Sequence, residues 1–142
     1  MSAADDQHQR IEAIVGDSED FDAAVTQFFE YLQNSLEFPC EVKGLEDFDW
    51  EEFYVLGPGD LDEYEQMKKT QPSYTDRYDL LALEREGFSQ WMLFDEDLAA
   101  HVSRQSDGQE FILGLAELEA VDKKSRNYQL LDDYVVFFVN NR

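Results

Sequence analysis

The sequence predicts an α+β fold, in which an N-terminal helix or helices pack on a small, partly open antiparallel β-barrel of the SH3-like type. Three observations support this class. An amphipathic helical pattern precedes Pro39, short strand-like runs follow it, and the chain closes on six consecutive apolar residues, Tyr134 to Val139. A chain of 142 residues suits one domain. Its 43% apolar and 14% aromatic content argues against disorder.

The N-terminal third is expected to be helical. Residues 1–16 form a tail and a short helix, with Arg10 to Val15 helical and Gly16 as its stop. Residues 17–37 form an amphipathic helix, because acids precede it and its apolar residues recur at steps of three and four. Those apolar residues are Phe21, Val25, Phe28, Phe29, Leu32 and Leu36.

Residues 38–142 are expected to be β-rich, since short apolar runs alternate with turn residues there. A buried final strand is expected because a continuous apolar run is typical of strands covered on both faces. The expected strands are Cys40–Leu45, Phe53–Leu56, Tyr78–Leu83 paired with Gln90–Phe94, Phe111–Leu115 and Tyr134–Val139. The expected helical pieces are Leu61–Thr70, Asp95–Arg104 and a turn at Asn127–Asp133, with Ala116–Val121 irregular or briefly helical.

Acidic residues dominate the charge. With 11 Lys and Arg against 33 Asp and Glu, the formal net charge is −22. Such a surface repels nucleic acid and anionic membranes and attracts cations or a basic protein partner. The N-terminus lacks an apolar signal core, and no run approaches a membrane span, so a cytoplasmic protein without a membrane partner is expected.

The acids are bunched rather than spread. Between Glu37 and Glu65 there are eleven acids and one base, Lys43. Calcium suits clustered carboxylates because it takes six to eight oxygen ligands in flexible geometry. No register fits an EF-hand: a loop that starts at Asp47 has glutamate at its sixth position, where glycine is required, and proline at its twelfth.

A non-modular calcium site is therefore the hypothesis. Asp60, Asp62 and Glu63 follow the Gly57-Pro58-Gly59 turn, whose carbonyls could add neutral ligands. Asp47 and Asp49 would join them if the intervening segment, expected to be a strand, folds back. The acids at 95–97 and 132–133 are further candidates, although acids at helix starts are more often caps.

Catalytic patterns are weak. Cys40 is the single cysteine, which excludes an internal disulfide or a cysteine-rich zinc site. His8 and His101 have no partner at metal or triad spacing, and the Gly57-Pro58-Gly59 turn lacks the lysine of a phosphate loop. We expect a protein that is not an enzyme.

Three segments resemble a known family. They are EEFYVLGPGD (51–60), PSYTDRYDLLALE (72–84) and DKKSRNYQLLDDYVVFFVNNR (122–142). They are similar to the small acidic calcium-binding proteins of the cyanobacterial CcbP type. The resemblance implies a cytoplasmic protein that binds calcium without an EF-hand and buffers or senses it. Two alternatives remain: an acidic interaction module that docks on a basic partner, and a charge-adapted domain without a specific metal site.

Overall fold

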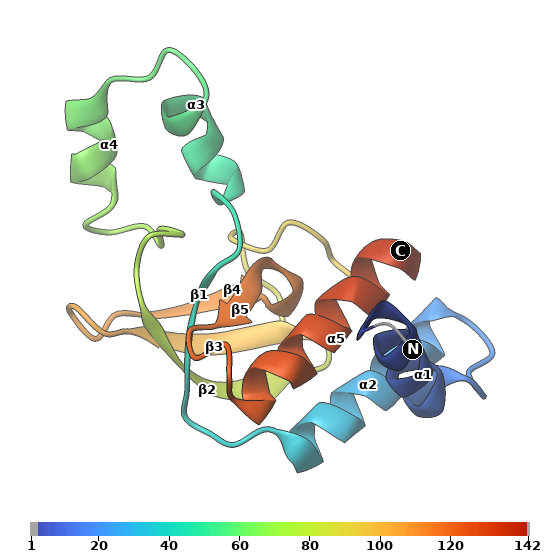
Figure 1. Ribbon diagram of the computed structural model, residues 1–142. Coiled ribbons are helices and arrows are strands. Elements are labelled where there is room, and N and C mark those ends of the chain that lie inside the picture. Colours follow the sequence, from blue (N-terminus) through green and yellow to red (C-terminus); the bar gives the residue numbers. More distant parts are fainter. Residues whose placement is uncertain (1–2, 142) are drawn as a thin grey trace.

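The computed structural model describes residues 3–141 and shows an open sheet with helices on one side and a protruding helical hairpin (Figure 1). Within the described residues the helices are α1 (Ala3–Val15), α2 (Phe21–Ser35), α3 (Glu52–Val55), α4 (Leu61–Met67) and α5 (Arg126–Asn141). The strands are β1 (Cys40–Gly44), β2 (Tyr78–Glu84), β3 (Ala99–Arg104), β4 (Glu110–Gly114) and β5 (Leu118–Ala120). Short 3₁₀ turns occupy Asp49–Glu51 and Leu115–Glu117.

The five strands form one sheet in the order β4-β3-β2-β1-β5, with every pairing antiparallel. This confirms the α+β class and the antiparallel sheet. Closure into an SH3-like barrel is not confirmed, because β4 and β5 stand at opposite edges of the sheet. β3 and β4 are joined by a turn at Gly108, whose φ of 76° is a conformation that favours glycine.

The helices α1, α2 and α5 cover the sheet on one side (Figure 1). α5 packs against β5 and α2 against β2, while α1 lies against α2 and α5. Aromatic rings join the two inner helices: Phe28 of α2 packs edge-on against Tyr134 of α5 and stacks on Phe137. No helix among residues 3–141 is long and apolar enough to cross a membrane.

The helix predicted over residues 17–37 is confirmed in its core. The carboxylate of Asp20 caps α2 by accepting from the Ala23 amide at 2.8 Å, as expected of an acid at a helix start. Four residues at helical spacing are buried on one face of α2: Ala24, Val25, Phe28 and Leu32. The single cysteine, Cys40, is buried at the start of β1.

The expected final strand is wrong. Residues 134–139 belong to α5, a continuous helix that also includes the turn expected at 127–133. The buried residues of α5 recur at helical steps, whereas Val139 is exposed. A run of six apolar residues fits both a buried strand and the wide apolar face of a helix, and packing against α2 selects the helix. The buried residues are Leu130, Leu131, Asp133, Tyr134, Phe137 and Phe138.

The elements expected between residues 90 and 104 are also wrong. Gln90–Phe94 forms no strand, and Ala99–Arg104 is β3 rather than part of a helix. β2 pairs with β3 instead, with Tyr78 opposite Arg104 and Glu84 opposite Ala99. The alternating burial of Ala100, Val102 and Arg104 has a period of two, which a strand produces. The passage expected to be irregular or briefly helical, 116–121, contains the end of the 3₁₀ turn Leu115–Glu117 and then the short strand β5.

The strand expected at Phe53–Leu56 is wrong as well, since these residues lie in and just after α3. Tyr54 is buried, but Phe53 and Leu56 are exposed, so the apolar run covers more than one helix face. A run of four apolar residues is too short for periodicity to separate helix from strand. The helix expected at Leu61–Thr70 is confirmed as α4, which ends three residues earlier.

Candidate metal centre on an acidic hairpin

The chain leaves the sheet after β1 and returns to it at β2 through a protruding hairpin, residues 46–72, that contains α3 and α4 (Figure 1). Between Glu46 and Glu65 this acidic hairpin has nine acids and no base. Gly44 stands at its root, where an added Cβ would lie only 2.7 Å from the Tyr74 Cβ. The close approach of the two legs therefore requires glycine at this position.

Glu51 anchors the first leg of the acidic hairpin. Its side chain is fully buried, and both oxygens accept hydrogen bonds. Tyr64 and Ser73 donate their hydroxyls to Oε2, each at 2.6 Å. The amides of Tyr74 and Phe48 donate to Oε1 at 2.8 and 3.2 Å. Because four donors surround it, the buried charge is compensated and joins both legs of the hairpin.

Arg104 of β3 anchors the second leg. Its guanidinium is almost fully buried and donates to the carbonyls of Lys68, Lys69 and Gln71, at 2.9 to 3.0 Å, just after α4. The same group pairs with Asp76 at 3.1 Å and Asp107 at 2.8 Å. The hydrogen bonds that Arg104 donates, helped by the Gln109 amide, hold the pKa of the Asp107 carboxyl well below its usual range. A cation thus satisfies the carbonyls at the C-terminal end of α4.

Aromatic rings hold α3 and α4 together. Tyr54 and Tyr64 stack with centroids 5.3 Å apart and an interplanar angle of 8°. Trp50 packs against both rings, at 5.7 Å from Tyr64 and 6.2 Å from Tyr54. The acidic hairpin therefore has a small aromatic core of its own, and its carboxylates project from a defined scaffold.

The first predicted ligand set lies at the start of α4. Asp60 caps this helix, with its Oδ1 accepting from the Asp62 amide at 3.0 Å. Glu63 accepts the Tyr54 hydroxyl on Oε1 at 3.1 Å. All three carboxylates, Asp60, Asp62 and Glu63, are exposed. The structure thus places these residues within one helical turn.

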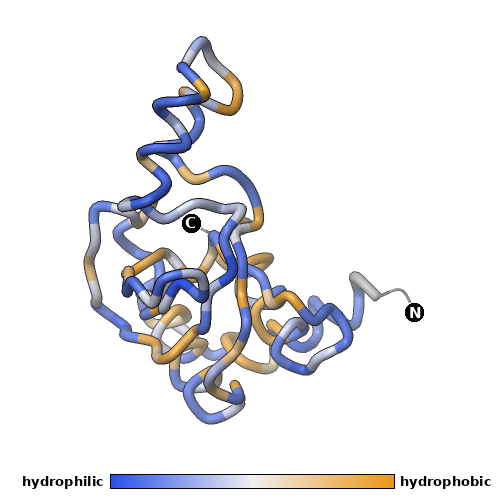
Figure 2. Tube along the Cα trace, turned by 90° about the vertical axis from the view of Figure 1, so that its left-hand side faces the viewer, coloured by the Kyte–Doolittle hydropathy of each residue, from blue (hydrophilic) through white to orange (hydrophobic). Residues whose placement is uncertain are grey.

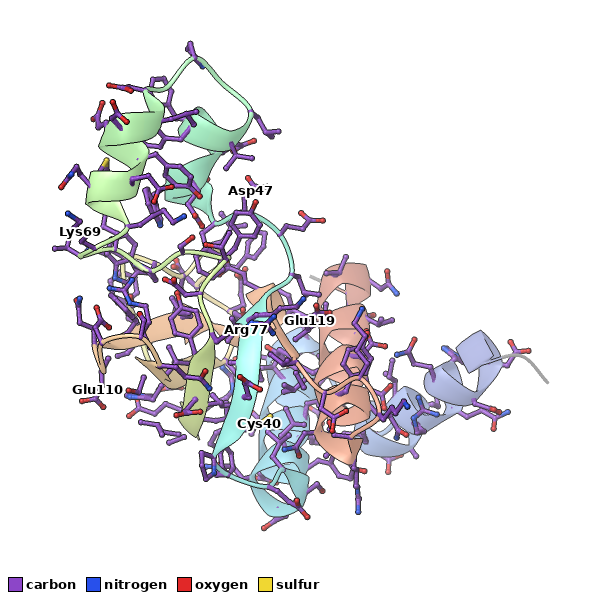
Figure 3. The ribbon with its side chains drawn as sticks, turned by 60° about the vertical axis from the view of Figure 1, so that its left-hand side comes forward. Cys40, Asp47, Lys69, Arg77, Glu110 and Glu119 are labelled. Atoms are coloured by element: carbon purple, nitrogen blue, oxygen red, sulfur yellow. The ribbon has the colours of Figure 1, made fainter. Side chains whose placement is uncertain are left out.

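Asp47 and Asp49, the second predicted pair, lie at the root of the acidic hairpin rather than near Asp60. Figure 3 shows Asp47 where the chain enters the hairpin from β1. Asp47 lines a cavity of about 320 Å³ together with Glu46 and Glu117. Within residues 3–141, no group of three or more histidines, cysteines or acids is arranged to hold a metal. A calcium ion would therefore have to draw these carboxylates together.

Sequence reasoning missed a carboxylate pair beside this root, in which Asp97 is buried and Glu117 half-buried. An added Cβ on Gly114 would lie 2.6 Å from Asp97 Oδ2 and 2.7 Å from Glu117 Oε2, so both carboxylates crowd one point. Burial raises the pKa of Asp97 to about 7, although hydrogen bonds from Tyr134, Ala116 and Leu98 oppose the shift. Burial likewise raises the pKa of Glu117 to about 7, and the charges of Asp97 and Asp49 act in the same direction.

The remaining acidic candidates have other roles or no enclosing partners. Asp133 is buried in α5 and pairs with Arg10 at 2.9 Å, and Gln7 donates to both Asp132 and Asp133. Asp95 and Glu96 are exposed in the loop before β3. The 132–133 pair is thus largely compensated by protein groups. No local spacing indicates this pairing, because Arg10 and Asp133 lie on different helices and are 123 residues apart.

No protein-family model and no curated protein matches the chain. Solved structures do match. The crystal structure of Anabaena CcbP aligns with a TM-score of 0.61 over 97% of this chain and 93% of that one. The chain has the CcbP fold. A calcium-binding protein in its calcium-binding form aligns with a TM-score of 0.60, over 99% of this chain and 97% of that one. Sequence identity is 18% in both cases, so the agreement with CcbP concerns the fold.

Proposed function

We propose that this protein binds calcium through carboxylates of the acidic hairpin, without an EF-hand, and acts as a cytoplasmic calcium buffer or sensor rather than as an enzyme. The observation that carries the proposal is the fold shared, over nearly the whole chain, with CcbP and with a calcium-binding protein in its calcium-binding form. The concentration of acids on one protruding hairpin supports it independently.

The donor chemistry of the acidic hairpin fits calcium. Asp60, Asp62 and Glu63 present hard oxygen ligands, and each is open to solvent. Asp60 and Glu63 each accept one hydrogen bond, which leaves their second oxygens available. Carbonyls of the Gly57-Pro58-Gly59 turn would supply neutral ligands. Asp47 and Asp49 at the hairpin root are the second choice.

Calcium binding at this hairpin would bring the carboxylates together rather than fill a preformed site. The carboxylates are not gathered in the described residues, so the ion must offset the cost of bringing like charges together. Glu51 and Arg104 fix the two legs, which confines the rearrangement to the side chains. The sheet would stay unchanged, and the charge of the hairpin would fall.

Calorimetric titration tests the proposal. Calcium should bind and raise the melting temperature. The free energy of unfolding should rise by about 2.7 kcal/mol when free calcium is a hundred times the dissociation constant. Magnesium should act more weakly, because it retains its waters and prefers fewer protein ligands. Sodium chloride at matched ionic strength is the control for screening. Equal stabilisation by all three salts would contradict a calcium site and favour the charge-adapted alternative.

A further inference from the structure

The tip of the acidic hairpin exposes a group of large apolar side chains. Phe53 is 56% exposed, Leu56 72% and Leu61 68%, and Val55 is 40% exposed. These four residues, hereafter the tip patch, flank the turn between α3 and α4. Single exposed apolar residues are ordinary, but four within residues 53–61 of one protruding element indicate an interaction surface. In Figure 2 the protruding hairpin carries hydrophobic segments near its end, between hydrophilic ones.

The tip patch rests on a fixed backbone. The Leu56 amide donates to the Glu52 carbonyl at 3.0 Å and ends α3. The Gly59 amide donates to the Phe53 carbonyl at 3.2 Å, which folds the turn back over the helix. An added Cβ on Gly59 would lie 2.5 Å from the Tyr54 ring, so the turn is packed closely against α3. A surface fixed in this way loses little conformational entropy when a partner binds.

Exposed carboxylates share these elements with the tip patch. Glu52, Asp60, Asp62 and Glu65 are exposed on the same two helices and the turn between them. The nearest bases along the chain are Lys43, in β1, and Lys68, after α4, whose Nζ lies 3.5 Å from Oε1 of Glu65. An apolar centre with an acidic rim is complementary to a surface with an apolar centre and a basic rim.

We propose that the tip patch is a docking surface for a basic, amphipathic helical segment of another protein. The partner would insert apolar side chains between Phe53, Leu56 and Leu61 and would place lysines or arginines against the acidic rim. A second copy of this chain is disfavoured because the same acids would meet, and an anionic membrane is disfavoured for the same reason. This surface does not depend on a bound calcium ion.

A pair of synthetic peptides tests the proposal. Each has ~14 residues of leucine and lysine, one with the leucines on a single helical face and one with the same composition scrambled. In the presence of a calcium chelator, the full-length protein should bind the amphipathic peptide and not the scrambled one. L56S/L61S should weaken this binding by about tenfold or more, because two anchoring side chains are lost. E52Q/E65Q should weaken it less and flatten its dependence on salt.

The matched control is Phe88→Ser. Phe88 is 74% exposed but lines a cavity beside α2, with Asp22 and Val25, so its loss should leave peptide binding unchanged. All the replaced side chains are largely exposed, so the variants should keep the melting temperature of the parent. An unaltered melting temperature excludes misfolding as the cause of weaker binding. Equal binding of both peptides, no binding of either peptide, or unchanged peptide binding by L56S/L61S would overturn the proposal. Binding to phosphatidylserine vesicles, or self-association, that depends on Leu56 and Leu61 would overturn it as well. Because the chelator removes calcium, peptide binding is tested independently of the proposed calcium site.

Discussion

The hydroxyl of Tyr134 donates a 2.6 Å hydrogen bond to Oδ1 of Asp97. This bond joins α5 to the segment that leads into β3, in the protein core. The same hydroxyl accepts from the Leu98 amide at 3.1 Å. Asp97 is buried, and its other donors are the amides of Leu98 and Ala116. Removal of this hydroxyl should therefore leave a buried carboxylate with one strong donor fewer.

Tyr134→Phe should lower the free energy of unfolding by about 1–3 kcal/mol at pH 8, the usual cost of a buried polar group left without a partner. The cost should shrink at pH 5, where Asp97 is protonated and needs less stabilisation. Urea unfolding at both pH values measures the difference. Tyr31→Phe on α2, where the ring is exposed, is the control. An equal loss at pH 5 and pH 8 would show that the hydroxyl does not stabilise the charged carboxylate.

The raised carboxyl pKa values of Asp97 and Glu117 predict that the stability of the fold decreases as the pH rises. The pKa values of Asp97 and Glu117 are raised to about 7 in the folded protein, so between pH 4 and pH 7 the folded state holds more protons than the unfolded one. Their contribution to stability is therefore lost as the pH rises through this window. The melting temperature should rise when the pH falls from about 8 to about 5.

Glu117→Gln isolates one of the two groups. At pH 8 the substitution should stabilise the fold by roughly 1–2 kcal/mol, because it removes a half-buried charge that faces Asp97. At pH 5 it should change little, since the parent carboxyl is then neutral. Thermal melts of the parent and of Glu119→Gln, on the neighbouring strand β5, provide the comparison. A destabilisation at pH 8 would show that Glu117 is stabilised by its neighbours rather than strained by them.

Glu51 should control the order of the acidic hairpin. Glu51→Gln replaces one accepting oxygen with a donor, so the hydroxyls of Tyr64 and Ser73 or the amides of Phe48 and Tyr74 lose a partner. Amide hydrogen exchange should accelerate in residues 48–67 and change little in β3 and β4. Glu52→Gln, one position along and exposed, is the matched control. Uniform acceleration across the protein would mean that Glu51 supports the whole fold.

Asp60→Asn distinguishes the proposed role of Asp60 as a metal ligand from its role as a helix cap. Asparagine caps helices as well as aspartate does, so the calcium-free stability should stay the same or rise slightly as repulsion falls. Calcium affinity should fall by tenfold or more, which is at least ~1.4 kcal/mol. Calorimetric titration of the variant and of Glu119→Gln makes the comparison. If the variant binds calcium like the parent, the site lies elsewhere, and Asp47 with Asp49 is the second candidate.

The sequence predicted α2 well because its apolar side chains have a clear period and an acid stands at its start. The same reasoning failed for α5, where six adjacent apolar residues hide the period, and for residues 90–104, where β2 had two possible partners. Such choices depend on contacts between distant segments, here Phe28 with Tyr134 and Tyr78 with Arg104.

The candidate site was predictable only in part. The concentration of acids before Glu65 is visible in the sequence, and the CcbP resemblance of the quoted segments agrees with the fold. The anchoring role of Glu51 was not visible, because its donors come from positions 3 to 23 residues away. The Asp97–Glu117 pair was equally hidden, since Gly114 brings the two side chains together only in the folded chain.

The register of the first two strands has a consequence for how this protein can vary. β1 and β2 are direct antiparallel neighbours, with Val42 opposite Tyr78, so a tight turn would connect them equally well. The acidic hairpin is thus an insertion within a strand connection, and Glu51, Arg104 and Gln109 help to attach it. Segments of this kind tolerate changes in length and composition without new sheet topology. The length and the surface chemistry of the acidic hairpin are therefore free to diverge on an unchanged framework.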